Sequence, residues 1–226
     1  MGGRLSELWP LEDDEWSEHF FVDGMSVTIS GFLCTTIDGW LDDVLLRFDV
    51  ADDKHMRLAA IADGRALHGA AQLDAWKTRV ATYPDGLRAA MLRHHLDCER
   101  RWQDADMLAD RDERLALADM LVRMERKLMG ALLALNRRYA PDSRHKWARR
   151  LARQLQLAPD DLASRLVRAW QLQPATAVEE LRALFDETVA LVETHVPAFD
   201  TTFVRACLGH RRSPATPWAH ATRRSG

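Results

Sequence analysis

Basic and aromatic residues gather in one stretch of the sequence, ALNRRYAPDSRHKWARRL at residues 134–151, which holds five arginines. Its apolar spacing predicts a helix that ends near Arg138, a turn over Pro141 and a second helix that begins near Asp142 or Ser143. Cations are favoured at the C-terminal end of a helix, whereas the amides at a helix N-terminus attract anions. The stretch is therefore either a charged helix junction over an aromatic core, or a binding site for an anion such as phosphate.

The anion-site interpretation names specific side chains in this stretch. We expect Arg138, Arg144 and Lys146 to contact an anionic ligand through charge-assisted hydrogen bonds, with Trp147 lining the same site. His145 lies between two of these cations and can join them. The alternative interpretation uses the same residues as a solvated helix junction and needs no ligand.

Other patterns that mark catalytic or metal sites are absent from the sequence. The nucleophile elbow GxSxG and the phosphate loops GxxxxGK[ST] and GxGxxG do not occur. His94 and His95 are adjacent, so on a helix they point about 100° apart and cannot share an ion. Asp104 and Asp106 match the DxD spacing of two-metal sites but lie in a helical context. The three cysteines form no CxxC pair. We therefore expect no bound metal and no cofactor.

The net charge of −3 conceals an uneven distribution along the 226 residues. Residues 1–53 hold 13 acidic and 2 basic residues, whereas the remainder holds 21 acidic and 29 basic residues. Such a split is typical of two parts that face each other or of an anion site in the basic part, although solvated faces also produce it. The overall charge argues against nucleic-acid binding. No apolar run is long enough to span a bilayer and no signal peptide is visible, so we expect a cytoplasmic protein without membrane contact.

The N-terminal part of the sequence predicts a small β-structure. An Asp-Gly pair at 23–24 separates a short apolar run from an alternating one, which is typical of a hairpin with strands at about 19–22 and 25–32. The sequence then changes to helical spacing. A second Asp-Gly pair at 63–64 fits either a helix end or another small hairpin.

From Pro84 onward the periodicity is helical, and the longest element keeps one apolar face throughout. The expected fold class is mostly α with a small N-terminal β portion (α+β), in which the sheet packs on a C-terminal helical bundle. We expect an α+β portion at 1–83, a bundle at 84–209 and a flexible tail at 210–226. The apolar face of the longest helix comprises Leu117, Leu121, Met124, Leu128, Leu132 and Leu135.

Three stretches together resemble a known family. LAAIADGRALHGAAQLDAWKTRVATYPDGLRAAML, which begins at Leu58, and LLALNRRYAPDSRHKWARRL resemble the C-terminal half of bacterial nucleotidyltransferase-superfamily proteins, in the branch related to aminoglycoside nucleotidyltransferases. FFVDGMSVTISGF resembles the strand that carries the third catalytic acid of that family. The resemblance covers residues 19–195. It implies an active cleft beside the 134–151 stretch, in which Lys146 approaches a triphosphate and Tyr139 or Trp147 shapes the substrate site.

The sequence departs from this family at the residues that hold metal. Thr28 stands where the third acid is expected, and neither the Gly-Ser loop nor the Asp-x-Asp strand is found before position 19. A magnesium pair stabilises the charge of a transferring phosphoryl group, and these carboxylates would hold it. The sequence therefore predicts a degenerate active site and no metal-dependent nucleotidyl transfer by this chain alone.

The favoured functional hypothesis is a repurposed family member with metal-independent chemistry. It binds and transforms a small polar metabolite, of anionic type, in the cleft between the β portion and the bundle. General acid–base groups for that reaction are His19, Asp23, Tyr139 and His145. Two alternatives stay open: a split or truncated nucleotidyltransferase that takes its catalytic acids from a partner, and a non-catalytic regulatory or interaction protein. A homodimer is compatible with each of them.

Overall fold

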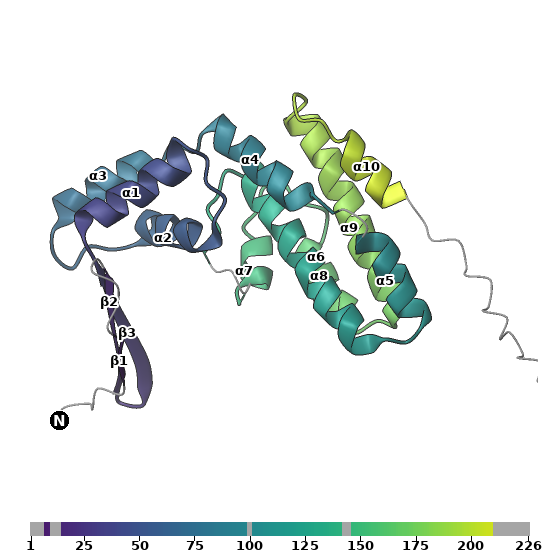
Figure 1. Cartoon of the computed structure of the whole chain (residues 1–226), viewed down its shortest axis with the longest axis horizontal. Coiled ribbons are helices and arrows are strands. Elements are labelled where there is room, and N and C mark those ends of the chain that lie inside the picture. The colour runs from purple at the N-terminus through teal and green to yellow at the C-terminus, as the bar shows by residue number, and fades with distance from the viewer. Residues whose placement is uncertain (1–6, 10–14, 99–100, 142–145, 210–226) are drawn as a thin grey trace, which may run out of the picture.

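The chain folds as a set of helices preceded by a small antiparallel sheet (Figure 1), which confirms the predicted fold class. This computed structural model describes residues 7–9, 15–98, 101–141 and 146–209. The strands are β1 (Glu7–Trp9), β2 (Glu15–Val22) and β3 (Met25–Phe32). The helices are α1 (Cys34–Leu45), α2 (Asp52–Asp63), α3 (Ala70–Val80), α4 (Asp85–Leu96), α5 (Arg101–Asp110), α6 (Arg114–Leu135), α7 (Ala148–Ala152), α8 (Leu162–Ala169), α9 (Pro174–His195) and α10 (Thr202–Gly209).

The hairpin of β2 and β3 forms around the predicted turn. Asp23 and Gly24 have φ angles of 47° and 78°, and two positive φ angles in succession match the right-handed twist of the strands on either side. Strand β2 begins four residues earlier than expected, and the short β1 pairs with its outer edge. Trp16 lies over Gly31, where an added Cβ would be 2.0 Å from the indole Nε1. A side chain at position 31 would therefore displace the indole.

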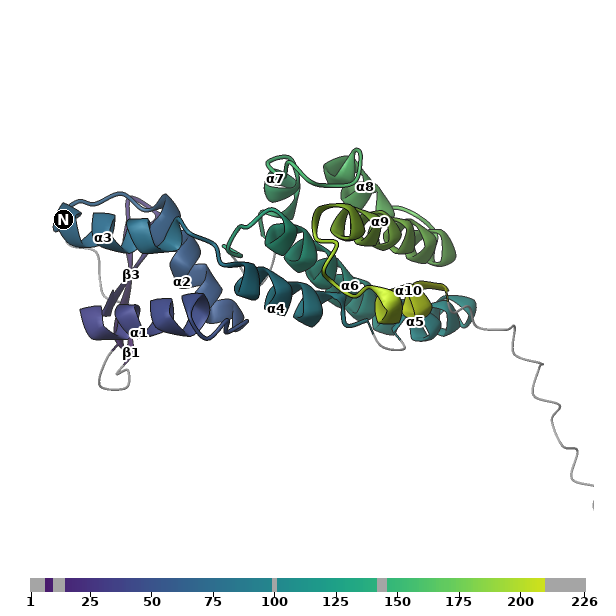
Figure 2. The ribbon, with the colours of Figure 1, turned by 90° about the horizontal axis from the view of Figure 1, so that it is seen from above.

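The sheet contacts α1 and α2, and not the bundle as the sequence analysis expected. The rings of Phe32 and Trp40 lie 4.9 Å apart, and the Arg57 guanidinium stacks 4.5 Å from the Phe32 ring centroid. The same guanidinium forms an ion pair with Glu15 at 3.3 Å. Figures 1 and 2 show the hairpin extending from the α1–α3 group, away from α4–α10. In the described parts of the chain, α1, α2 and α3 lie between the sheet and the bundle, so these two do not face each other across the expected cleft.

One face of the sheet is apolar and remains largely exposed. The strand pairing places alternate residues of β2 and β3 on this face, and Met25 exposes 67% of its surface. An isolated hairpin is only marginally stable in water, so its contacts with α1 and α2 are needed to hold it in place. The apolar side chains on this face are Trp16, Phe20, Val22, Met25, Val27 and Ile29.

Helix α2 settles the alternative that the sequence left open at its second Asp-Gly pair. Asp52 and Asp53 occupy the first turn, where carboxylates interact favourably with the helix dipole. The helix ends at Asp63, and Gly64 continues in an extended conformation. The pair is therefore a helix end and not a hairpin.

Helix α6 is the centre of the bundle and packs on α4, α5 and α9. All six residues of its predicted apolar face are buried, which confirms the face assignment. The first helical run after Pro84, expected as one element, forms two helices: α4 ends at Leu96 and α5 begins at Arg101. Seen from above, α8 and α9 form a second layer beside α4, α5 and α6 (Figure 2). Within the described residues, no helix combines the length and apolarity needed to cross a bilayer.

Candidate functional site

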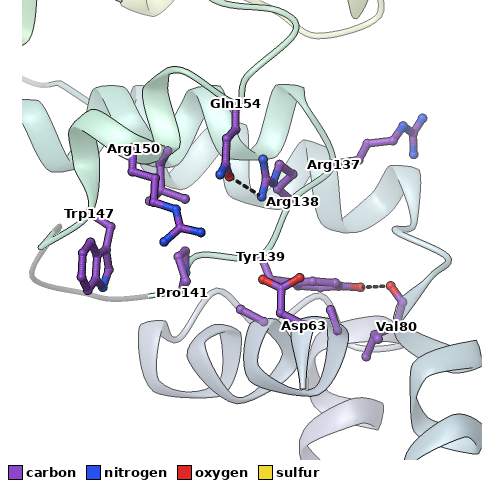
Figure 3. Close-up of a pocket in the computed structure, with 12 residues that line it drawn as sticks. Asp63, Val80, Arg137, Arg138, Tyr139, Pro141, Trp147, Arg150 and Gln154 are labelled. Carbon is purple, nitrogen blue, oxygen red and sulfur yellow. Dashed lines mark hydrogen bonds between the residues drawn. The ribbon is translucent and has the colours of Figure 1, made fainter. Parts of the chain in front are cut away.

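A cavity of about 610 Å³ lies between α2 and the connection from α6 to α7 (Figure 3). Its size suits a small molecule. The N-terminal helices meet the 134–151 stretch at this cavity. Its walls therefore come from segments about 75 residues apart in the chain, such as Asp63 and Arg138. No residue of the sheet lines it. The lining residues are Ala59, Ala62 and Asp63 of α2, Val80 at the end of α3, Arg137, Arg138, Tyr139 and Pro141 of the connection, and Trp147, Arg150, Leu151 and Gln154 in and around α7.

Tyr139 is a buried, structural wall of this cavity. Its hydroxyl donates a hydrogen bond of 3.0 Å to the Val80 carbonyl, and its ring lies 5.1 Å from the Tyr83 ring and 5.9 Å from the His55 ring. Burial raises the pKa of Tyr139 to about 12. Because the phenol stays protonated and its proton is directed at a backbone carbonyl, this geometry does not favour the predicted proton transfer at neutral pH.

His55 lies under the same wall and is fully buried on α2. Its Nε2 donates a hydrogen bond of 3.0 Å to the Asp49 carbonyl, which leaves Nδ1 as a buried acceptor without a partner. Burial lowers the pKa of His55 below its usual 6.5. The folded state therefore holds this imidazole in the neutral form.

We expect the stability of the protein to depend on pH through His55. Below about pH 6.5 the unfolded chain binds a proton at this position that the folded chain does not, so stability falls on acidification. Relative to His55→Gln, the wild-type free energy of unfolding should fall by about 1 kcal/mol between pH 7.5 and 5.5. Urea denaturation at several pH values measures this difference. Parallel stability curves for the two proteins would show that His55 titrates normally in the folded state.

Arg137 points away from the cavity and is committed to the fold (Figure 3). Its backbone has a φ of 54° just after the end of α6, a conformation that a residue without a Cβ adopts more easily. The guanidinium donates to the Tyr83 carbonyl at 2.7 Å and to the Asp85 carboxylate at 2.5 Å. It therefore ties the end of α6 to the start of α4 and is not available to a ligand.

Of the three arginines that line the cavity, Arg138 and Arg150 have guanidiniums that can reach a ligand. Arg138 donates to the Gln154 side-chain oxygen at 3.2 Å, and Arg150 has no hydrogen bond or ion pair in the part of the chain that the structure describes. Figure 3 shows the Arg150 guanidinium directed from α7 toward Pro141, beside Arg138. Elsewhere in the fold many arginines are neutralised by carboxylates, as Arg165 is by Glu180. Two uncompensated guanidiniums on one wall favour an anion.

A second hollow of about 490 Å³ continues the basic surface on the outer side of α7. It shares Trp147, Arg150 and Gln154 with the first cavity, and Trp147 exposes 56% of its surface. Lys146 borders this outer hollow and does not line the first cavity. The remaining lining residues are Arg149 and Arg153.

The structure brings together some of the predicted site residues and not others. Arg138 and Trp147 line the cavity as expected, while Tyr139 lines it in a structural role. His19 and Asp23 lie on the hairpin, outside the cavity, so the predicted catalytic group is not assembled around it. The His19 ring instead contacts the hydroxyl groups of Thr28 at 3.0 Å and of Ser26 at 3.4 Å. The predicted residues Arg144 and His145 lie outside the described part of the chain.

Asp63, Arg150 and Gln154 are among the cavity residues that the sequence did not predict. Arg150 and Gln154 follow one another at helical spacing in and just after α7, a pattern that could have placed both on one face. Asp63 belongs to the second Asp-Gly pair, for which the sequence predicted only a helix end or a turn. Its position across from α7 depends on how α2 packs and could not be read from local sequence.

The described segments contain no group of three or more histidine, cysteine, aspartate or glutamate side chains placed to hold a metal ion. In comparisons with known proteins, one family model matches residues 53–148, and it is described as a domain of unknown function, DUF4037. The matched segment runs from α2 to the start of α7 and includes both walls of the cavity as far as Trp147. No curated protein and no solved structure matches the chain.

Proposed function

We propose that this chain binds a small anionic molecule, of the phosphate type, in the cavity between α2 and α7. The observation that carries this proposal is the pair Arg138 and Arg150, whose charges no carboxylate in the described structure neutralises, on the wall of a small-molecule-sized cavity. The proposal includes the expected kinship with nucleotidyltransferases, for which the sequence resemblance remains the support.

The guanidiniums of Arg138 and Arg150 and the apolar side chains around them suit a bound phosphate group. A guanidinium offers several donors in a fixed plane and binds phosphate oxygens in pairs. Leu151 and the Tyr139 ring make part of the wall apolar, which reduces competition from water around the bound anion. Trp147 at the outer end adds a flat, exposed ring against which an organic part of the ligand can pack.

The proposal is for binding and does not include a reaction. His19 and Asp23 are on the hairpin, and the Tyr139 hydroxyl is occupied by the Val80 carbonyl. An acid–base reaction needs a titrating group within hydrogen-bond reach of the substrate, and the buried Tyr139 phenol, with its pKa raised to about 12, is poorly suited to that role. Of the hypothesis that the chain binds and transforms a small metabolite, we therefore propose only the binding.

Arg150→Gln is the sharpest single test of this proposal. We expect it to weaken the binding of ethyl phosphate by about tenfold, because a charge-assisted hydrogen bond on a partly exposed wall is lost. Isothermal titration calorimetry or phosphorus NMR of the ligand measures the change. Arg150 is exposed and has no partner among the described residues, so the melting temperature should stay unchanged.

The matched control is Arg93→Gln, which removes an exposed arginine on α4 away from the cavity. It lowers the overall positive charge by the same amount, so it reports non-specific attraction of the probe. We expect wild-type affinity for this control. If both variants weaken binding equally, the cavity does not hold the anion and the proposal fails.

A further inference from the structure

We infer that the ligand of this cavity is zwitterionic: a small phosphate monoester that also carries a protonated amine, held between Arg150 on one side and Asp63 on the other. The inference rests on the proposed anion-binding function and adds the second charge of the ligand. The C-terminal end of α2, with Asp63, forms the side of the cavity that faces α7, and this side suggests a positive charge on the ligand.

Asp63 is placed where a carboxylate is unfavourable for the fold. It is the last residue of α2, and the C-terminal end of a helix carries partial negative charge from its free carbonyl groups. No basic residue lies in the last turn, and Gly64 leaves the helix in an extended conformation without a backbone hydrogen bond that caps it. The carboxylate and the helix end together make an electronegative wall that attracts a cation.

Asp63 is also exposed to the cavity without a partner. It makes no hydrogen bond or ion pair with any residue that the structure describes, although three arginines line the same cavity. Figure 3 shows its carboxylate extending from the α2 side of the cavity, while the Arg150 guanidinium extends from α7. Opposite charges that face one cavity without pairing leave room for a ligand between them.

The charges of the two walls define the class of ligand. A phosphate monoester carries about two negative charges at neutral pH, which match the guanidiniums of Arg138 and Arg150. A purely anionic ligand would be repelled by the negative charge of Asp63. A purely cationic ligand would be repelled by the positive charges of the arginines. A primary ammonium has three donors, enough for the Asp63 carboxylate and for free carbonyls of the last turn of α2.

Two probes that differ only in the amine test this inference. O-phosphoethanolamine and ethyl phosphate have the same phosphate monoester, but only the first carries an ammonium group. We expect the wild-type protein to bind phosphoethanolamine about tenfold more tightly, because one additional charge-assisted interaction forms at Asp63. Titration calorimetry or ligand NMR with each probe gives the ratio of the two dissociation constants.

Asp63→Asn should reduce this ratio to about one and should improve the affinity for ethyl phosphate, since it removes a negative charge that faces the phosphate. Arg150→Gln should weaken both probes about equally. Asp63 is exposed at a helix end, so Asp63→Asn should keep the wild-type circular dichroism and melting temperature.

The outcomes separate the inference from the proposed function. If both probes bind equally and both need Arg150, the anion site stands and the zwitterion inference is overturned. A tenfold preference that persists in Asp63→Asn overturns it as well, because the amine then binds elsewhere. If neither probe binds in a manner that depends on Arg150, the proposed function itself fails.

Discussion

Leu128→Asp is expected to unfold the helical bundle at neutral pH. Leu128 lies in the middle of α6 with no exposed surface, and α6 packs on α4, α5 and α9. A carboxylate there would be removed from water without a partner, in addition to the loss of the leucine packing. We expect a loss of about 4 kcal/mol or more, against a total stability of about 5–15 kcal/mol for a typical domain. Circular dichroism during urea denaturation measures it.

The matched control for this variant is Val122→Asp, on an exposed position of the same helix. It makes a similar change in helix propensity and charge without burying the carboxylate, so the loss should stay below about 1 kcal/mol. Similar losses for the two variants would mean that the assigned face of α6 is not the one that packs in the bundle.

Arg182→Met is expected to have the second largest effect on stability. Arg182 is buried on α9 with 5% of its side chain exposed, and it forms an ion pair with Asp106 of α5 at 2.6 Å. It also donates to the Trp102 carbonyl at 3.3 Å, while its guanidinium lies 5.4 Å from the Trp102 ring centroid. Removing the cation leaves the mostly buried Asp106 carboxylate uncompensated between α5 and α9. We expect a loss of about 3 kcal/mol or more in the free energy of unfolding.

Two further variants isolate the cause of that loss. Arg123→Met removes an exposed arginine that pairs with Asp119 on the surface of α6, and it should cost less than about 0.5 kcal/mol. The double variant Arg182→Met with Asp106→Leu removes both charges, and it should recover a large part of the stability. If it is no more stable than Arg182→Met, the loss comes from packing around Trp102 and not from the unpaired carboxylate.

The buried pair and the cavity arginines show two uses of the same residue type. Arg182 joins α5 to α9, and Arg137 joins α6 to the start of α4, so both are tied to carboxylates of the fold. Arg138 and Arg150 pair with no carboxylate among the described residues, and both line the cavity. Arginine content alone therefore does not locate the site, since the partner of each guanidinium decides its role.

Local patterns in the amino-acid sequence were enough for several of the elements and for part of the cavity. The period of the apolar residues in α6 predicted its buried face, because residues three and four apart share one side of a helix. The Asp-Gly pair predicted the hairpin turn, because that turn needs two positive φ angles. The density of cations at 134–151 pointed to the corner where Arg138 and Trp147 now line a cavity.

The arrangement of those elements depended on contacts between distant residues, which local patterns do not encode. The sheet packs on α1 and α2 because Phe32 meets Trp40 and Arg57, so His19 and Asp23 are carried away from the corner that they were expected to face. The packing of α2 against the corner places Asp63 across from α7. A turn residue thereby became part of a cavity wall, and a predicted catalytic tyrosine became a buried hydrogen-bond donor, because burial and partners are properties of the folded chain.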